Sequence, residues 1–428
     1  MNTQLPVLHR TIKWLSLCLF IIASVKATAQ QTGLVTLKAG AAAVDITPAE
    51  AVPMSGYAGR EGATGEVHDQ IFARAIVFDD GTQKACLIQA DLIGFGHDFA
   101  DEITGRITDK TGIPANNIML IAAHNHGGPS TRVYGEGKDN KALDKYIKEL
   151  KNKLVDVAIT ANKTPEVVET GFGLGRCTMN INRRARQANG DIWLGRNPDG
   201  PCDRDVAIMR IDKANGDPAA LFVNWPCHAT TGGQENLKIT GDWPGATARH
   251  VQKHYGENVP VAVTAGASAD INPIYGPNNR FGDIDAIGLI LGEEIVSVTE
   301  AIKTTPATGI KAVRRNIIVP GKKRSASRKA GETIEPGEDE EIRLSVIKIG
   351  NIVFAGISGE LMTEIGMEVK NNSPFRNTII VTHCNGSSGY LCTDKAYKEG
   401  GYEPMVSRVM PGTEQMIVDA FREMLNGL

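Results

Sequence analysis

Short apolar runs that alternate with amphipathic segments constrain the fold of this chain more than any other feature of its sequence. Continuous apolar runs of six to eight residues are typical of strands that are covered on both faces. Six such runs predict strands at Lys84–Asp91, Asn117–Ala123, Ala219–Trp225, Val259–Thr264, Asn351–Ile357 and Asn377–Thr382. A chain built in this way needs other elements to cover both faces of its sheet.

Predicted amphipathic helices are suited to cover the faces of the sheet. In three segments, apolar residues recur at spacings of three and four, which places them on one face of a helix. These residues are Phe99, Ile103 and Ile107, then Leu143, Ile147, Leu150, Leu154 and Val157, and finally Ile417, Phe421 and Leu425. Strands that alternate with helices along the chain indicate an α/β domain.

The composition argues against nucleic-acid binding. The 428 residues hold 46 Lys and Arg against 49 Asp and Glu, so the net charge is −3. Proteins that bind nucleic acid usually present a clustered basic surface, and those that bind single strands also present aromatic side chains on which bases stack. Only 5% of the residues are aromatic. We therefore expect no nucleic-acid partner.

The N-terminus has the pattern of a secretory signal peptide. His9, Arg10 and Lys13 precede an apolar run over residues 14–25, and Ala27-Thr28-Ala29 then offers a small-x-small cleavage site. The run is short for a membrane-spanning helix, and no later stretch reaches that length. The sequence predicts a signal peptide over residues 1–29 and an exported mature chain, periplasmic or extracellular, without a transmembrane segment.

Six cysteines remain in the predicted mature chain. An even number in an oxidising compartment is compatible with disulfides, and the local pairs to test first are Cys177 with Cys202 and Cys384 with Cys392. The alternative is that these side chains are free, buried thiols that pack as small apolar residues. Both interpretations stay open at the level of sequence.

Polar residues follow several of the predicted strands at the point where each strand ends. His124-Asn125-His126 follows one strand and His228 another, while Glu360 and Tyr390 follow the last two. The carboxyl ends of strands line the ligand crevice in open α/β sheets, so these side chains are expected to converge. Imidazole and carboxylate groups that converge in a cleft favour a transition-metal site.

Each of these residues also has an ordinary structural interpretation. His124 and His126 lie two residues apart and project from the same side of an extended segment, with or without a metal. A single histidine such as His228 is often a hydrogen-bonded structural residue. Glu360 would be a suitable cap for a helix over Leu361–Val369, and Tyr390 a packed aromatic side chain.

One segment, residues 321–341, changes from basic to acidic and contains almost no apolar residue. It predicts an exposed loop between strands. Its basic residues Lys322, Lys323 and Arg324 have two interpretations, an anion-binding site or a solvated run of charge, and a run of charge is usually solvated.

An ordered set of motifs resembles the catalytic domain of the neutral ceramidases, zinc-dependent amidases that cleave the N-acyl bond of ceramide. The resemblance covers nearly all of the predicted mature chain, and it is the set that is specific, not any single motif. Its members are GAAAVDITP from Gly40, MSGYA from Met54, VHDQIFARA from Val67, AAHNHGGP from Ala122, Asn182-Arg183, NWPCHATT from Asn224, ASADINP from Ala267, SGE from Ser358 and GYLCT from Gly389.

The resemblance implies a fold and a set of site residues. It implies an α/β fold with a mixed β-sheet core, flanking helices and a zinc site at the strand ends, in one catalytic domain over residues 30–428. It further implies that one Zn²⁺ per chain is bound by four residues, which are His124, His228, Glu360 and Tyr390. His126 then matches a residue that shuttles a proton or stabilises the oxyanion, and Arg183 an arginine near the metal.

Two departures from the family pattern affect the expected substrate. Asn272 stands where the family has a serine associated with catalysis, and an amide donates hydrogen bonds but is no nucleophile. The chain also ends before the C-terminal β-sandwich-like domain that family ceramidases carry, so we expect no such domain here. Three functions follow: hydrolysis of an N-acyl amide in a small-molecule or lipid-like substrate, hydrolysis of another bond such as an ester or an acylated glycan, and a non-enzymatic binding protein.

Overall fold

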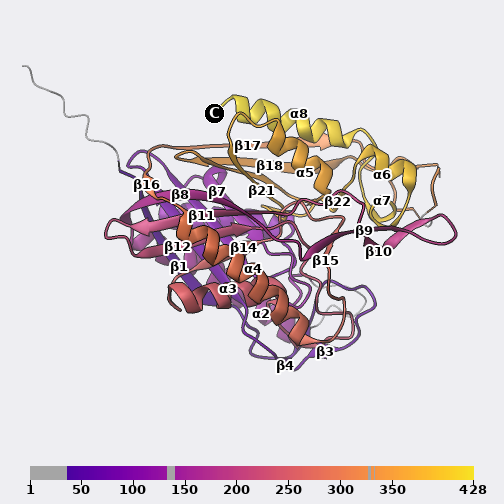
Figure 1. The fold of residues 1–428 in the computed structure, drawn as a ribbon, viewed down its shortest axis with the longest axis horizontal. Helices are drawn as coiled ribbons and strands as arrows, with labels where there is room; N and C mark the ends of the chain where they lie inside the picture. Colours follow the sequence, from indigo (N-terminus) through magenta and orange to yellow (C-terminus); the bar gives the residue numbers. More distant parts are fainter. Residues whose placement is uncertain (1–35, 133–139, 326–328, 332) are drawn as a thin grey trace, which may run out of the picture. The chain divides into compact units, whose positions relative to one another are not determined.

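The fold is known from a computed structural model that describes residues 36–132, 140–325, 329–331 and 333–428. The predicted signal peptide, residues 1–29, lies outside the described residues. Within them, two large sheets and eight helices account for most of the chain (Figure 1).

The first sheet has nine strands among the described residues, in the order β14-β12-β11-β8-β1-β5-β6-β7, with β16 paired to β8. The pairs β6–β7 and β12–β14 are parallel and the other pairs are antiparallel, so the sheet is mixed. Its strands are β1 Lys38–Asp45, β5 Phe72–Asp79, β6 Lys84–Ala90, β7 Ile118–Ala122, β8 Glu166–Arg176, β11 Asp205–Lys213, β12 Pro218–Asn224, β14 Val261–Thr264 and β16 Thr305–Pro306.

The second sheet comes from the C-terminal third of the chain. Its order is β17-β18-β19-β21, and β19 pairs with β21 in parallel. These strands are β17 Ile310–Val319, β18 Glu340–Ile349, β19 Ile352–Ile357 and β21 Asn377–Val381. A smaller sheet joins β10 Ile192–Asn197, β9 Asn180–Arg186 and β15 Ile271–Pro273.

Three short two-stranded pairings complete the β-structure that is described. They join β2 Val52–Pro53 with β3 Ala63–Thr64, β4 Glu66–Val67 with β13 Lys238–Ile239, and β20 Glu360–Leu361 with β22 Tyr390–Leu391.

Some of the helix ends carry recognisable caps. The side chain of Asn140 accepts a hydrogen bond from the Leu143 amide at the start of α2, and α1 ends at Gly112, whose φ of 74° suits a residue without Cβ. The helices are α1 His97–Thr111, α2 Lys141–Lys163, α3 Asp242–Tyr255, α4 Phe281–Ala301, α5 Thr363–Asn371, α6 Asp394–Glu399, α7 Tyr402–Val406 and α8 Thr413–Asn426, with a 3₁₀ turn at Ala115–Asn117.

The two large sheets pack face to face, and helices cover their outer faces. In β7, Leu120 faces the core shared with α1 and α2, whereas Ile121 faces the second sheet. In β19, Phe354 faces the first sheet and meets Phe222 edge to face at 5.0 Å, whereas Ala355 faces α5 and α8. The result is a helix–sheet–sheet–helix arrangement, with α1 to α4 on one side and α5 and α8 on the other (Figure 1).

The structure confirms the α/β fold and the mixed sheet with flanking helices that the sequence predicts. Each of the six predicted strands corresponds to an observed strand, and the three amphipathic segments lie in α1, α2 and α8. The helix expected over Leu361–Val369 begins at Thr363 instead, so the interpretation of Glu360 as its cap is wrong: Glu360 belongs to β20. None of the described helices combines the length and apolar character that crossing a membrane requires.

Candidate metal centre

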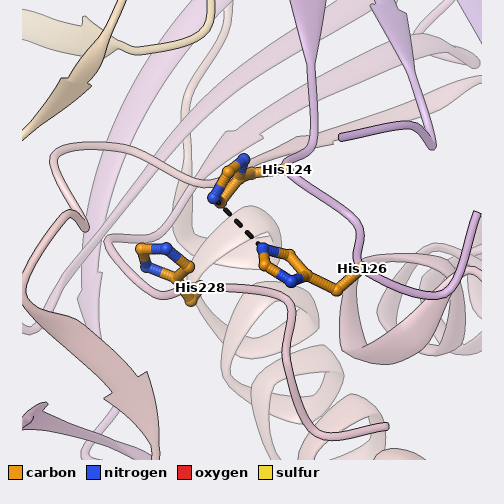
Figure 2. A group of neighbouring side chains, drawn as sticks. All are labelled: His124, His126 and His228. Atoms are coloured by element: carbon orange, nitrogen blue, oxygen red, sulfur yellow. Dashed lines mark hydrogen bonds between the residues drawn. The ribbon is translucent and has the colours of Figure 1, made fainter. Parts of the chain in front are cut away.

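Two neighbouring loops bring three histidines together. His124 and His126 follow β7, and His228 follows β12. The loops run side by side, since the His126 amide donates to the Ala229 carbonyl at 3.0 Å. Nε2 of His126 lies 3.3 Å from Nε2 of His124, and one ring nitrogen from each of the three histidines falls within 4.8 Å of the others (Figure 2).

His124 reaches this position through an unusual backbone conformation. Its φ is +56°, in the left-handed region that residues with a Cβ seldom adopt. Such a conformation turns the chain sharply at the end of β7, and strain of this kind is concentrated at functional sites. The His124 ring also stacks on that of His383, at 3.8 Å between centroids and 13° between planes.

Glu360 and Tyr390 come to the same place from the second sheet. They are paired across the short parallel bridge of β20 and β22, which fixes the two side chains beside each other. Oε2 of Glu360 lies 3.4 Å from Nε2 of His124 and 3.4 Å from Nε2 of His228. The four residues that the sequence predicts as ligands therefore meet at one site, although they are spread over most of the chain.

The hydrogen bonds of the two histidines fix their tautomers. Nδ1 of His124 donates to the Ile93 carbonyl at 3.0 Å, and Nδ1 of His228 donates to the Ser268 carbonyl at 2.6 Å. A neutral histidine that carries its proton on Nδ1 has a lone pair on Nε2. The Nε2 atoms that carry these lone pairs are the ones that lie 3.4 Å from the Glu360 carboxylate. A hydrogen bond from the other ring nitrogen to a backbone carbonyl is the usual arrangement of a metal-bound histidine.

The donor set fits a zinc ion. Oε2 of Glu360 is buried and has no hydrogen-bond partner among the described residues. Two lone pairs and a carboxylate oxygen facing one point repel one another unless a cation lies between them. Donors held about 2.0–2.1 Å from a tetrahedral ion are separated from each other by about 3.3 Å, close to the distances observed here.

The electrostatics of the site favour the metal-binding forms of these groups. Burial lowers the pKa of His228 to about 4, and the Arg183 charge acts in the same direction, so the ring is neutral near pH 7. Burial opposes ionisation of Glu360, whereas protons on His124 and His228 hold the pKa of that carboxyl well below its usual range. A metal ion in the place of those protons would act in the same direction. Neutral imidazole and ionised carboxylate are the forms that coordinate metals.

His126 stands beside the ligand set. Its Nδ1 is buried and has no hydrogen-bond partner in the part of the chain that the structure describes, and its ring meets Tyr57 edge to face at 5.1 Å. Gly56 packs directly on the ring, because a Cβ at this position would lie 2.5 Å from Nδ1. Burial, and then the neighbouring His124 and His228, lower the pKa of His126 well below its usual value, which keeps the ring neutral.

Arg183 is a buried residue that contacts both the candidate ligands and Glu403. It lies on β9 and is 4% exposed. Its Nη1 lies 3.3 Å from Nε2 of His228, and its Nη2 donates to the Tyr390 hydroxyl at 3.1 Å. Glu403, which is 1% exposed, accepts from Nε of Arg183 at 2.8 Å and from Nη1 of Arg184 at 2.8 Å. The guanidinium of Arg183 is therefore held rigidly at the edge of the ligand set.

Asn272 lies in β15, next to Arg183. Its Oδ1 accepts a hydrogen bond from Nη1 of Arg183 at 3.3 Å, and the residue is part of the lining of the cavity described below. The position that carries serine in the family pattern therefore belongs to the site.

A cavity of about 590 Å³ opens over these residues. Its lining includes three of the four candidate ligands, His124, Glu360 and Tyr390. It also includes apolar and aromatic side chains, which are Tyr57, Ile93, Leu194, Pro273, Pro277 and Tyr402. A volume of this size matches sites for small molecules with an apolar portion.

Sequence reasoning missed Tyr402, Glu403 and His383. Tyr402 meets Tyr390 edge to face at 5.7 Å, and Glu403 anchors Arg183. A glycine pair, Gly400-Gly401, precedes Tyr402, and glycine beside a polar residue is the signal that marked the other strand-end motifs. His383 directly follows the apolar run over Asn377–Thr382, but no spacing pattern in the sequence predicts that its ring stacks on that of His124.

The cysteines are free in the structure. Cys86, Cys177, Cys202, Cys227, Cys384 and Cys392 form no disulfide. The pairs Cys177–Cys202 and Cys384–Cys392 are therefore wrong for this structure, and the interpretation as free thiols applies. All but Cys202 are buried, so they pack as small apolar side chains.

Comparisons with known proteins place this site in a family. The sequence profile described as "Neutral/alkaline non-lysosomal ceramidase, N-terminal" matches residues 37–272, more than half of the chain. Neutral ceramidase B of Dictyostelium discoideum is 26% identical over 226 residues, covering 48% of this chain and 30% of that protein. Neutral ceramidase of Pseudomonas aeruginosa is 26% identical over 276 residues, covering 58% and 40%. The chain thus spans well under half the length of these curated relatives.

Solved structures show the same fold. A structure described as "Ceramidase complexed with C2" matches with a TM-score of 0.77 and 17% identity, covering 91% of this chain and 75% of the other. The crystal structure of neutral ceramidase from Pseudomonas aeruginosa matches with a TM-score of 0.76 and 18% identity, covering 92% and 75%. Because the sequence profile matches over half of the chain and the fold agrees, the chain belongs to the neutral/alkaline non-lysosomal ceramidase family.

Proposed function

We propose that the chain is an exported zinc-dependent hydrolase that cleaves the N-acyl amide bond of a small-molecule or lipid-like substrate. The observation that supports it most is the convergence of His124, His228 and Glu360 on one point, with both Nδ1 atoms bound to backbone carbonyls. Family membership supports amide hydrolysis as the reaction.

In this proposal His124, His228 and Glu360 hold the ion, and Tyr390 is the fourth ligand. Zinc bound in such a site supplies a Lewis acid and lowers the pKa of a water molecule towards neutrality. Burial, and then the charge of Glu360, raise the pKa of Tyr390 well above its usual value, so the phenol stays protonated unless a cation is bound beside it.

Arg183 has the position to stabilise negative charge on the substrate oxygen. Its guanidinium is always ionised and lies against His228 and Tyr390, at the border of the ligand set. Glu403 holds it in one orientation, so no reorganisation is needed as charge develops on the scissile carbonyl.

His126 has the properties of a proton carrier. Its Nε2 faces the site, and a neutral ring accepts a proton there and returns it to a leaving amine. The metal-site geometry also allows His126 to be a ligand, since its ring belongs to the three-histidine cluster. We assign the proton-transfer role because Glu360 already completes the set with His124 and His228.

The apolar walls of the cavity favour a substrate with a hydrocarbon portion. Leu194 and Pro277 are among its lining residues, together with the candidate ligands His124 and Glu360. The scissile bond would lie at the base and the apolar portion along the walls.

A substrate screen of the purified mature chain tests this proposal. We expect the zinc-loaded protein to hydrolyse at least one N-acyl compound among N-acyl sphingoid lipids and soluble N-acyl amides, and a chelator to abolish the activity until zinc is restored. Product formation is measured by mass spectrometry. Activity that survives complete removal of the metal would contradict the proposal.

The second candidate function is hydrolysis of another acyl bond, such as an ester or an acylated glycan. Asn272 favours it, because the family serine is replaced by a side chain with different hydrogen-bonding geometry at the base of the cavity. The same screen includes O-acyl compounds, and a preference for them would select this alternative.

Replacing Asn272 with alanine is expected to lower turnover by about 100- to 1000-fold without loss of zinc. The reason is that one preorganised donor to an oxyanion typically contributes a factor of this size. Turnover, zinc content and melting temperature are measured on the same preparations, with Asn272→Ser as the matched variant that restores the family residue. A lower melting temperature with unchanged turnover would mean that Asn272 only holds the turn before Pro273.

A further inference from the structure

A second cavity of about 470 Å³ lies beside α7. Residues of α7 contribute to both cavities: Tyr402 lines the one over the candidate metal centre, whereas Pro404 and Met405 line the second. The basic segment that begins at Lys322 also contributes to the lining of the second cavity. The proposed zinc hydrolase activity assigns no role to this cavity.

Lys322 is the central residue of the second cavity. It is only 7% exposed, and its ammonium group donates to the Lys323 carbonyl at 3.2 Å. No carboxylate of the described residues lies within 4 Å of this ammonium group. Buried ammonium groups normally have an anionic partner, because removing a charge from water is costly. Burial and the charge of Arg324 accordingly lower the pKa of Lys322.

The wall that carries Lys322 is held by backbone hydrogen bonds. The Lys322 amide donates to the Arg408 carbonyl at 2.8 Å, and the Ser325 amide donates to the Met405 carbonyl at 3.2 Å. On its other side, the Lys323 amide donates to the Glu335 carbonyl at 3.0 Å. The segment is therefore fixed to two other parts of the chain, and the position of Lys322 is defined by the fold.

The lining of the cavity combines positive charge with an apolar surface. Lys323 is paired with Glu335 at 3.3 Å, and Glu335 is the acidic residue of the described lining. Lys322, Arg324 and Lys329 are the other basic residues of the lining. Met405 and Tyr397 also line the cavity, and the Tyr397 hydroxyl donates to the Val409 carbonyl at 2.7 Å, so its proton is not available to a ligand.

We propose that the second cavity binds a phosphate-type oxyanion carried on a small apolar group. The anion would contact Lys322 and Arg324, and the apolar group would pack against Tyr397 and Met405. An ammonium group in a site with restricted access to water binds an oxyanion more strongly than an exposed lysine does. The oxyanion has two sources, a soluble phosphate monoester and the headgroup of an anionic lipid.

Isothermal titration calorimetry with phenyl phosphate tests the proposal on the full mature protein. Wild-type protein is expected to bind phenyl phosphate, and Lys322→Met to weaken the binding by at least about tenfold, because a charge-assisted hydrogen bond is lost. Lys323→Met is the matched control, since this neighbour is exposed and already paired with Glu335; it is expected to change the affinity by less than about twofold. Binding to the candidate metal centre would be the same in all three proteins.

Further measurements test whether the variants fold and identify the source of the oxyanion. Melting temperatures identify a Lys322→Met protein that fails to fold, in which case Arg324→Gln, at an exposed position, decides in its place. Co-sedimentation with phosphatidylcholine vesicles, with and without phosphatidic acid, identifies a lipid headgroup, and binding of phenyl phosphate alone identifies a soluble monoester. Absence of binding to the wild-type protein, or equal binding to the wild type and the charge-removing variant, would overturn the proposal.

Discussion

Replacing His228 with alanine is expected to remove both the bound zinc and the hydrolytic activity. The wild-type protein should carry about one zinc per chain, since the donors describe a single site. Without Nε2 of His228, the remaining strong donors are His124 and Glu360, and two such ligands seldom retain zinc against buffer. Zinc is measured by atomic spectrometry after gel filtration, and activity on the best substrate from the screen.

Two further histidine variants make this result specific. His254→Ala is the matched control: this histidine is paired with Glu300 on the surface, and we expect zinc and turnover to stay unchanged. His126→Ala is expected to retain zinc while losing turnover, in keeping with a role in proton transfer. A metal-free His228→Ala protein with full activity would contradict the zinc assignment, and loss of zinc from His126→Ala would make His126 a ligand.

Replacing Glu403 with alanine is expected to lower the free energy of unfolding by about 3–5 kcal/mol. Glu403 is the buried carboxylate between Arg183 and Arg184, and removing it leaves Arg183 in the interior without its carboxylate partner and Arg184 with Glu399 alone. Turnover should fall as well, because Arg183 would no longer be fixed beside His228. The free energy is measured by urea denaturation with zinc kept constant.

A control variant and the pH dependence of stability distinguish the buried ion pairs of Glu403 from an ion pair at the surface. Glu399→Ala removes a half-exposed partner of Arg184 and is expected to cost no more than about 1 kcal/mol. Although burial opposes ionisation, Arg183 and Arg184 lower the pKa of Glu403. Its contribution is therefore complete above the ordinary carboxyl pKa and is lost as the pH falls through the lowered value. Equal stability of the wild type and Glu403→Ala near pH 7 would contradict this account.

Only part of the candidate site follows from signals that are local in the sequence. The run before His124 and the run before His228 are both short and continuously apolar, and such runs become buried strands whatever their partners are. Strand ends therefore mark the two histidines as candidates. Their meeting could not be predicted in this way, because five strands separate β7 from β12 in the first sheet and the two run in opposite directions. The histidines meet because the loops that follow these strands are joined by the hydrogen bond from the His126 amide to the Ala229 carbonyl.

The partners of these residues depend on contacts that no local pattern encodes. Glu403 meets Arg183 across 220 positions of the chain, and His383 stacks on His124 only because the two sheets pack face to face. The presence of two large sheets was itself not predicted, since a buried strand has the same pattern in one sheet as in another.

For Lys322, the local sequence pattern predicts the wrong exposure. Its surroundings in sequence are strongly charged, and such a run usually indicates a solvated loop. The loop between β17 and β18 is confirmed, but Lys322 itself is buried by Met405 and its neighbours, to which the segment is bound through backbone hydrogen bonds. Composition describes the average exposure of a segment and not that of a single side chain.

The division of the candidate ligands between the two sheets has a consequence for biogenesis. His124 and His228 follow strands of the first sheet, whereas Glu360 and Tyr390 follow the last strands of the second. With the proposed zinc at this site, a nascent chain that has folded only its first sheet would hold two of the four donors, too few to retain the ion. Zinc would then be acquired only after both sheets have folded, and it would link the two sheets. Under the proposed function, metal content would report how much of a preparation has completed folding.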